Sequence, residues 1–150
     1  MHTRRRGFSL IELLVVIFIL GVGLASVGAL FVAGTISTRK AQRISAALNA
    51  AQQQVERMRS AGFSGCVVDP DVFTSSDGYT IIQQNPNLTG QMGFVVPDLP
   101  NAQGIIDIAF YSGSTGQYPN LKDVTVTVTW AGGASTGGST RLQTLIANRP

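Results

Sequence analysis

The feature that most constrains this chain is an uncharged apolar segment near its N-terminus. Residues 13–38 carry no charge, and about 20 apolar residues are enough to cross a bilayer as a helix. The segment is preceded by three arginines and begins beside one carboxylate, Glu12. A charged side chain inside a membrane helix costs about 2.5–3.5 kcal/mol, so Glu12 needs a partner or a purpose.

Arg4, Arg5 and Arg6 predict the orientation of this segment. Basic residues beside a membrane helix favour keeping that end in the cytoplasm, so the rest of the chain should emerge on the other side. Two other interpretations are a secretory signal peptide, cut after small residues near Ala29, and a simple membrane anchor with an intact N-terminus. The apolar run is long for a signal peptide, and neither interpretation explains Glu12.

A second apolar pattern predicts that the helix continues beyond the membrane. Apolar residues recur at alternating steps of three and four, which places them on one face of a helix. They are Ala41, Ile44, Leu48, Ala51, Val55 and Met58. No proline lies between Phe8 and Gly62, and glycine is typical just after a helix end. We therefore expect one helix of about 50 residues, with the stripe packed on a core.

The remainder of the chain predicts a small antiparallel sheet. Strands are expected at residues 79–83, 105–111, 123–130 and 140–148, with a glycine-rich turn at residues 131–139. Valine and threonine alternate in residues 123–130, so the valines and Trp130 should share one face. The segment from Cys66 to Leu99 is expected to be loop-rich. Because one sheet face needs cover, the fold class is α+β, with the sheet laid against the amphipathic half of the helix.

Composition argues against an enzyme and against a cofactor or metal site. The only histidine is His2, and Cys66 is the only cysteine, so we expect a buried, unreactive thiol. Four carboxylates could offer oxygen ligands to calcium, but they lack EF-hand spacing and are expected to be solvated. They are Asp69, Asp71, Asp98 and Asp123.

Cleavage after Gly7 would give Glu12 a purpose. The new N-terminal amine of Phe8 would lie four residues before Glu12, and a buried amine and carboxylate stabilise each other only when paired. Pairing within one helix is strained by direction, whereas pairing between staggered neighbours satisfies both charges. This arrangement predicts a self-assembling membrane protein.

The N-terminal motif resembles that of the type IV pilin and pseudopilin family. Its residues, which follow the arginine-rich leader, are Gly7-Phe8-Ser9-Leu10-Ile11-Glu12-Leu13-Leu14-Val15. The resemblance implies that a membrane aspartyl prepilin peptidase cleaves between Gly7 and Phe8 and that the same enzyme family methylates the Phe8 amine. It also implies that Glu12 neutralises the amine of a neighbouring subunit, and that residues 8–31 enter a filament core after extraction from the inner membrane.

Beyond the motif, the similarity is to PilV-type minor pilins and to minor pseudopilins of type II secretion. It is carried by residues 46–63, the valine and threonine strand with Trp130, and the closing residues 145–149. Two departures from major pilins fit a minor subunit: one cysteine cannot form a disulfide, and only glycines could replace the helix-breaking proline. Those glycines are Gly21, Gly23, Gly28 and Gly34. The expected parts are a leader (residues 1–7), a membrane and filament-core helix (8–37), its amphipathic half (38–61) and a head (62–150).

The resemblance also implies partners and a location. The partners are the prepilin peptidase and methyltransferase, other pilin or pseudopilin subunits, an inner-membrane assembly platform and, before assembly, the lipid bilayer. The precursor would have a cytoplasmic N-terminus and a periplasmic head, and would later join a pilus or pseudopilus at the cell surface or in the periplasm. A DNA-binding tip pilin would need exposed cations near Lys122 or Arg141. Residues 60–150 hold three basic and six acidic residues, so nucleic acid is not an expected partner.

Overall fold

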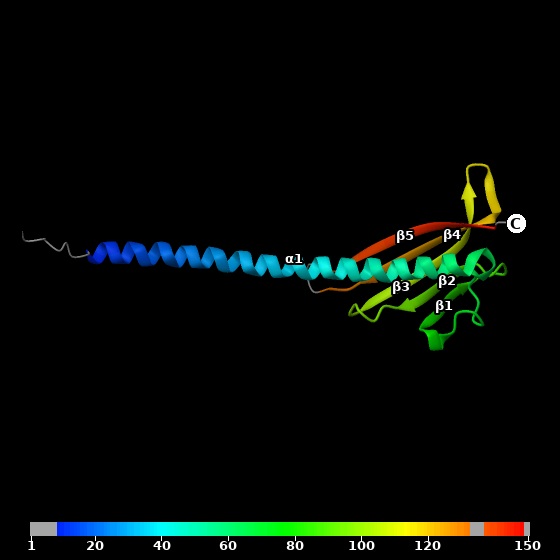
Figure 1. Cartoon of the computed structure of the whole chain (residues 1–150), viewed down its shortest axis with the longest axis horizontal. Helices are drawn as coiled ribbons and strands as arrows, with labels where there is room; N and C mark the ends of the chain where they lie inside the picture. Colours follow the sequence, from blue (N-terminus) through cyan, green and yellow to red (C-terminus); the bar gives the residue numbers. More distant parts are fainter. Residues whose placement is uncertain (1–8, 133–136, 149–150) are drawn as a thin grey trace, which may run out of the picture. The chain divides into compact units, whose positions relative to one another are not determined.

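The computed structural model of the chain describes residues 9–132 and 137–148 (Figure 1). Its long helix, α1, spans Leu10–Gly65, and a short 3-10 helix, η1, spans Ser75–Asp77. The five strands are β1 (Tyr79–Gln84), β2 (Gly90–Val95), β3 (Ala102–Gly113), β4 (Gly116–Trp130) and β5 (Gly138–Ala147). The chain divides into two compact units, Met1–Lys40 and Ala41–Pro150, and α1 runs from one into the other.

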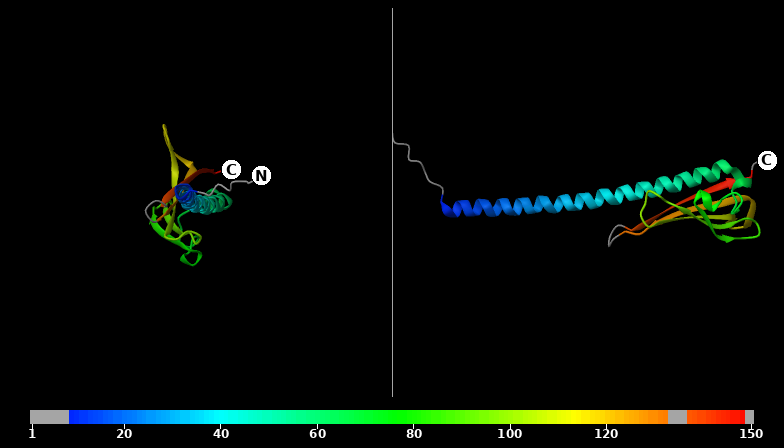
Figure 2. Two further views of the ribbon diagram at one scale, coloured as in Figure 1. Left: turned by 90° about the vertical axis from the view of Figure 1, so that its left-hand side faces the viewer. Right: turned by 90° about the horizontal axis from the view of Figure 1, so that it is seen from below.

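The second unit contains an antiparallel meander covered on one face by the C-terminal part of α1 (Figure 2). The strand order is β1-β2-β3-β4-β5, and every neighbouring pair is antiparallel. The predicted alternation in β4 is confirmed, because Val124, Val126 and Val128 are fully buried while the intervening threonines face away. The α+β prediction, a long N-terminal helix packed against a small antiparallel sheet, is confirmed.

The buried stripe of α1 begins later than the sequence predicted. Ala41 and Ile44 are exposed, so their predicted burial was wrong, and Leu48 is half-buried, so its predicted burial was only partly right. The predictions for Ala51, Val55 and Met58 are confirmed, since all three are buried, and Ala47, which was not predicted, is fully buried as well. Periodicity alone marks an apolar face, but the sheet covers only the part of that face from Ala47 onward. Alanine at the first contacts lets the helix backbone lie close to the strands.

The segment predicted to be loop-rich contains a strand that the sequence did not reveal. β2 has two glycines among six residues, which weakens the strand pattern. Gly90 has φ 137°, and a Cβ there would lie 2.1 Å from the Gln83 carbonyl oxygen. The close approach of β1 therefore requires glycine where a β-branched residue would have signalled a strand.

The end of α1 also differs from the prediction in detail. Gly62 has left-handed φ (70°) and interrupts the regular helix, as expected of a terminating glycine. The chain then makes one further turn, and α1 ends at Gly65. The additional turn places Cys66 in the core of the head, where it is fully buried.

In the first unit, α1 is uncharged and mostly apolar from Leu13 to Thr38. Within the part of the chain that the structure describes, it is the one helix long and apolar enough to cross a membrane. Three of its hydroxyl groups donate to carbonyls of the preceding turn: Ser26 to Val22, Thr35 to Val32, and Thr38 to Gly34. A hydroxyl satisfied in this way adds little cost to placing the helix in lipid.

Candidate functional site

The candidate site begins at the first turn of α1. The Ser9 carbonyl accepts hydrogen bonds from the backbone N–H groups of Glu12, at 3.0 Å, and Leu13, at 3.2 Å. Glu12 is thus in the first helical turn, where the unpaired N–H groups favour a carboxylate. Ser9 and Glu12 also have the sequence spacing of a capping box, which the sequence analysis did not consider.

Glu12 nevertheless has no charged partner within residues 9–132 and 137–148. The ion pair found there joins Glu56 and Arg59, in the second unit. The first turn can hold the Glu12 carboxylate near water, but burying it among apolar groups requires a cation from outside the described chain. This requirement is what the sequence analysis predicted for a subunit in an assembly.

The other predicted site residues lie outside the described residues. Gly7 and Phe8, the predicted cleavage and methylation positions, belong to residues 1–8, as do the leader arginines Arg4, Arg5 and Arg6. Their roles therefore stay predictions.

The apolar surface of α1 next to Glu12 is uncovered in the single chain. From Leu10 to Val32 its large apolar side chains have exposed fractions between 45% and 81%. A Cβ built on Gly21, Gly23, Gly28 or Gly34 meets nothing within 4 Å. No contact among the described residues therefore explains these glycines. Small residues at such positions are typical of helices that pack closely against one another.

Lys122 anchors the other end of α1 to the sheet. Its ammonium donates hydrogen bonds to the carbonyls of Cys66, at 2.6 Å, and Phe63, at 3.0 Å, and lies 4.7 Å from the centre of the Phe63 ring. These carbonyls belong to the last turn of the helix and its exit, where backbone acceptors lack helical partners and a cation is favourable. Lys122 is only 4% exposed, so it cannot contribute to an exposed cationic patch, and the suggestion that such a patch near Lys122 binds DNA was wrong.

Burial shifts the pKa values of Lys122 and Cys66. Desolvation lowers the pKa of Lys122, an effect that the neighbouring thiol partly opposes. Desolvation raises the pKa of Cys66 from 9.0 to about 11, and the lysine charge partly opposes that shift. The thiol is therefore protonated and shielded at neutral pH, as predicted for an unreactive cysteine.

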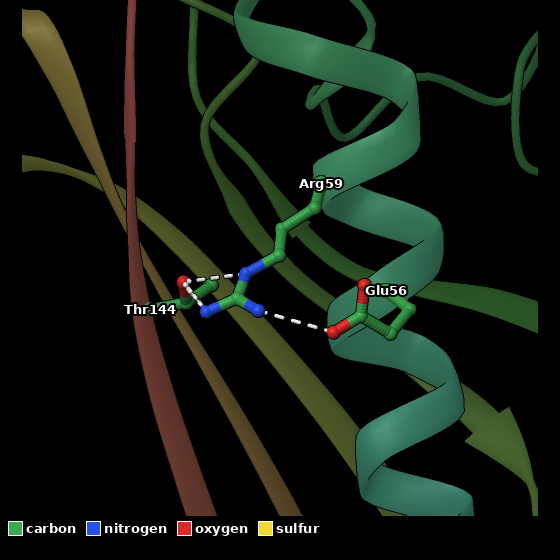
Figure 3. A network of polar contacts seen from close by, with 3 residues as sticks. All are labelled: Glu56, Arg59 and Thr144. Carbon is green, nitrogen blue, oxygen red and sulfur yellow. Dashed lines mark hydrogen bonds and ion pairs between the residues drawn. The ribbon is translucent and has the colours of Figure 1, made fainter.

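A second polar contact holds the edge strand β5 against α1 (Figure 3). The Arg59 Nε and one terminal nitrogen each donate to Thr144 Oγ1 at 3.1 Å, and the other terminal nitrogen donates to Glu56 at 3.0 Å. Thr144 is buried, so Arg59 supplies the partner that its hydroxyl oxygen needs.

The head was also considered as a calcium site and as a DNA-binding surface, and the described residues relevant to each lie as follows. Within the described residues no three His, Cys, Asp or Glu side chains are placed to share a metal ion. Asp69 accepts a hydrogen bond from the Asp71 backbone, and Asp123 accepts one from Gln143. Arg141 is exposed on the outer sheet face, where its guanidinium donates a hydrogen bond to Thr125 Oγ1 at 3.4 Å.

Comparison with known proteins gives one match. Residues 2–28 match the family model described as the prokaryotic N-terminal methylation motif. The matched segment includes residues 2–7 of the predicted leader, the predicted cleavage position and Glu12, and it supports the predicted resemblance to type IV pilins and pseudopilins. No curated protein and no solved structure was found to match the chain.

Proposed function

We propose that this chain, which has the N-terminal methylation motif of type IV pilins and pseudopilins, is a prepilin that matures into a minor subunit of a type IV pilus-like filament. The observation that carries the proposal is the matched motif. It is supported by Glu12, which has no charged partner among the described residues and lies in the first turn of an uncovered apolar helix. The α+β head is consistent with a structural subunit, and the chain is a substrate of enzymes rather than a catalyst.

Maturation starts with hydrolysis of the peptide bond between Gly7 and Phe8 by prepilin peptidase. The leader, with Arg4, Arg5 and Arg6, leaves with residues 1–7, and the Phe8 amine is then methylated. Before cleavage the arginines hold the N-terminus in the cytoplasm, so the head lies in the periplasm. Residues 8–37 form the membrane and filament-core part, residues 38–61 the amphipathic half of the helix, and residues 62–150 the head.

Assembly then pairs the Phe8 amine of one subunit with the Glu12 carboxylate of its neighbour. The two groups are four residues apart, about 6 Å along a helix axis. Pairing between parallel helices therefore requires an axial stagger of that order, and each added subunit presents the next unpaired group. The uncovered glycines allow the helices to approach closely while this pairing forms.

The filament system is a separate part of the proposal. Type II secretion pseudopilins share the methylation motif, so the chain could serve a secretion pseudopilus by the same assembly chemistry. A DNA-uptake tip subunit is disfavoured because Lys122 is buried and the head is acidic overall.

Mass spectrometry of the mature N-terminus tests the maturation step. The chain is expressed with and without prepilin peptidase, and we expect an N-terminal methylated Phe8 only when the enzyme is present. Gly7→Ala should abolish processing, while Gly23→Ala, a glycine substitution inside the helix, should be processed normally. An intact N-terminus, or a new one following Ala29, would contradict the proposal and indicate an anchor or a signal peptide.

A matched pair of glutamate substitutions tests the assembly step. Glu12→Gln removes the charge from the proposed pairing site, whereas Glu56→Gln removes the only other glutamate, which is exposed on the amphipathic half of α1. Both variants should be cleaved, but only Glu12→Gln should lose incorporation into sheared filaments by about tenfold or more, as expected when a buried charge loses its partner. Equal incorporation of the two variants would contradict the pairing argument.

A further inference from the structure

The end of the β3–β4 hairpin, which we call the tip ribbon (residues 111–120), separates from the rest of the sheet (Figure 1). The pairing of the two strands jumps from Phe110↔Lys122 to Tyr111↔Tyr118, so β4 has a bulge that includes Pro119. β2 pairs with β3 only up to Ile108, and β5 pairs with β4 only from Leu121 onward. Strands 111–113 and 116–118 therefore pair only with each other.

The tip ribbon adds nothing to the core of the head. Residues 114–120 are all exposed. The ribbon directly precedes Lys122, which binds the end of α1, so it lies at the end of this unit where α1 terminates rather than where Ala41 enters. Because these residues are exposed, core packing does not explain the presence of the ribbon, and an isolated two-stranded ribbon is itself only marginally stable in water.

Two tyrosines form an aromatic platform on the ribbon. The rings of Tyr111 and Tyr118 have centroids 5.8 Å apart and an interplanar angle of 40°. Gly113 lies beneath them: a Cβ there would be 2.9 Å from the Tyr118 ring and 3.5 Å from the Tyr111 ring. The Tyr118 hydroxyl is also hydrogen-bonded to Thr115 at 2.6 Å. These contacts orient the rings before any ligand arrives, which reduces the entropy cost of binding.

The groups around the platform are polar and uncharged. The ribbon contains only Tyr, Ser, Gly, Thr, Gln, Pro and Asn. Tyrosines set among serine, glycine and asparagine are typical of antibody binding loops, where rigid rings supply contact area and small polar residues supply adaptable hydrogen bonds. The absence of charge gives no electrostatic attraction for a polyanion or a cationic peptide.

A narrow ribbon of this kind fits a saccharide better than a protein. A stable protein interface buries about 800 Å² on each partner around an apolar centre, and the ribbon has no aliphatic side chain from Leu, Ile, Val or Met. A sugar ring instead presents C–H groups that stack on tyrosine and hydroxyls that bond to groups such as Gln117 and Asn120. We propose that the Tyr111–Tyr118 platform of the tip ribbon binds a neutral saccharide.

This inference relies on the proposed function only for the extracytoplasmic position of the head, where such polymers occur. Binding is measured with the purified full chain in detergent micelles, so the result does not depend on processing or filament assembly. A failure of binding would leave the maturation and assembly experiments unaffected.

The probe is an array of immobilised neutral and acidic oligosaccharides. We expect retention on neutral glycans and a loss of apparent affinity of about tenfold or more in the double variant Tyr111→Ala/Tyr118→Ala, since stacking on two rings is removed. Ile82→Ala/Val95→Ala is the matched control, because it truncates two exposed apolar side chains on another part of the sheet and should bind normally. Fluorescence of Trp130 verifies that each variant is folded.

Three results would overturn the proposal. They are the absence of binding to any neutral glycan, binding confined to acidic glycans, and unchanged binding by the tyrosine double variant. If that variant instead fails to copurify with other pilin subunits and no glycan is retained, the platform is a protein contact and the saccharide assignment is wrong. Gly113→Val gives an independent check, because it should displace the Tyr118 ring and weaken glycan binding without removing either tyrosine.

Discussion

Replacing Lys122 by methionine tests whether a buried ammonium holds α1 against the sheet. Methionine retains an unbranched apolar stem, so packing changes little, but the hydrogen bonds to the Phe63 and Cys66 carbonyls are lost. The cation–π contact with the Phe63 ring is lost as well.

The magnitude follows from two opposing effects. A hydrogen bond to a charged group contributes about 1.5–3 kcal/mol, and two are removed here. Burial of the ammonium costs desolvation energy, which is why the pKa of Lys122 is lowered. The variant avoids this cost, so part of the stability lost with the two hydrogen bonds is recovered. We expect a net loss of about 2 kcal/mol, which corresponds to a fall in Tm of about 8–15 °C for a domain of this size.

Thermal unfolding in detergent, monitored by fluorescence, is the assay. Trp130 is the only tryptophan and lies in the core, so its emission reports unfolding of the head. Lys40→Met is the matched control, because Lys40 is the only other lysine and is exposed. If Lys122→Met unfolds at the same temperature as Lys40→Met, the ammonium does not stabilise the helix end and the reasoning is refuted.

Two further predictions concern the same interface between α1 and the sheet. Because burial raises the pKa of Cys66 to about 11 from 9.0, the unfolded chain loses its thiol proton first as pH rises. The contribution of the buried thiol to the free energy of unfolding is complete below pH 9 and should fall by about 2 kcal/mol at pH 10.5. Urea unfolding measured at both pH values should therefore show a smaller loss of stability in Cys66→Ala than in the unmodified chain. An equal loss in the two proteins would contradict the assignment. Thr144→Val removes the acceptor of two Arg59 hydrogen bonds, but the Arg59 side chain is 54% exposed and can be rehydrated. We expect the free energy of unfolding in urea to fall by about 0.5–1.5 kcal/mol in Thr144→Val and to stay unchanged in the control Thr127→Val. If the two variants are equally stable, the contact between Arg59 and Thr144 does not stabilise the head.

Local patterns in the sequence were sufficient where one element's own residues decide its structure. The uncharged run and the absence of proline predicted a long helix, and strict alternation predicted β4 with its valines buried. Glu12 could be singled out because one carboxylate beside an apolar segment is costly in any fold that buries it.

Patterns failed where a partner distant in the sequence decides. β2 was missed because close contact with β1 requires Gly90. The apolar stripe of α1 was placed too early because nothing in the helix itself says where the sheet begins to cover it. Lys122 was treated as a possible surface cation, although the exit of α1, 56 residues away, buries it.

The sequence by itself thus determined the features on which the proposed assembly rests: an N-terminal methylation motif, an apolar helix and an acid near its start, all within about thirty consecutive residues. These properties depend on local composition and spacing, which tertiary contacts do not alter. The tertiary structure alone decided that Lys122 closes the helix end, that Arg59 holds the edge strand, and that a register shift frees the tyrosine platform. The first two join residues far apart in the chain, so they form only after the elements have packed, and the third depends on the register that β3 and β4 adopt in the sheet.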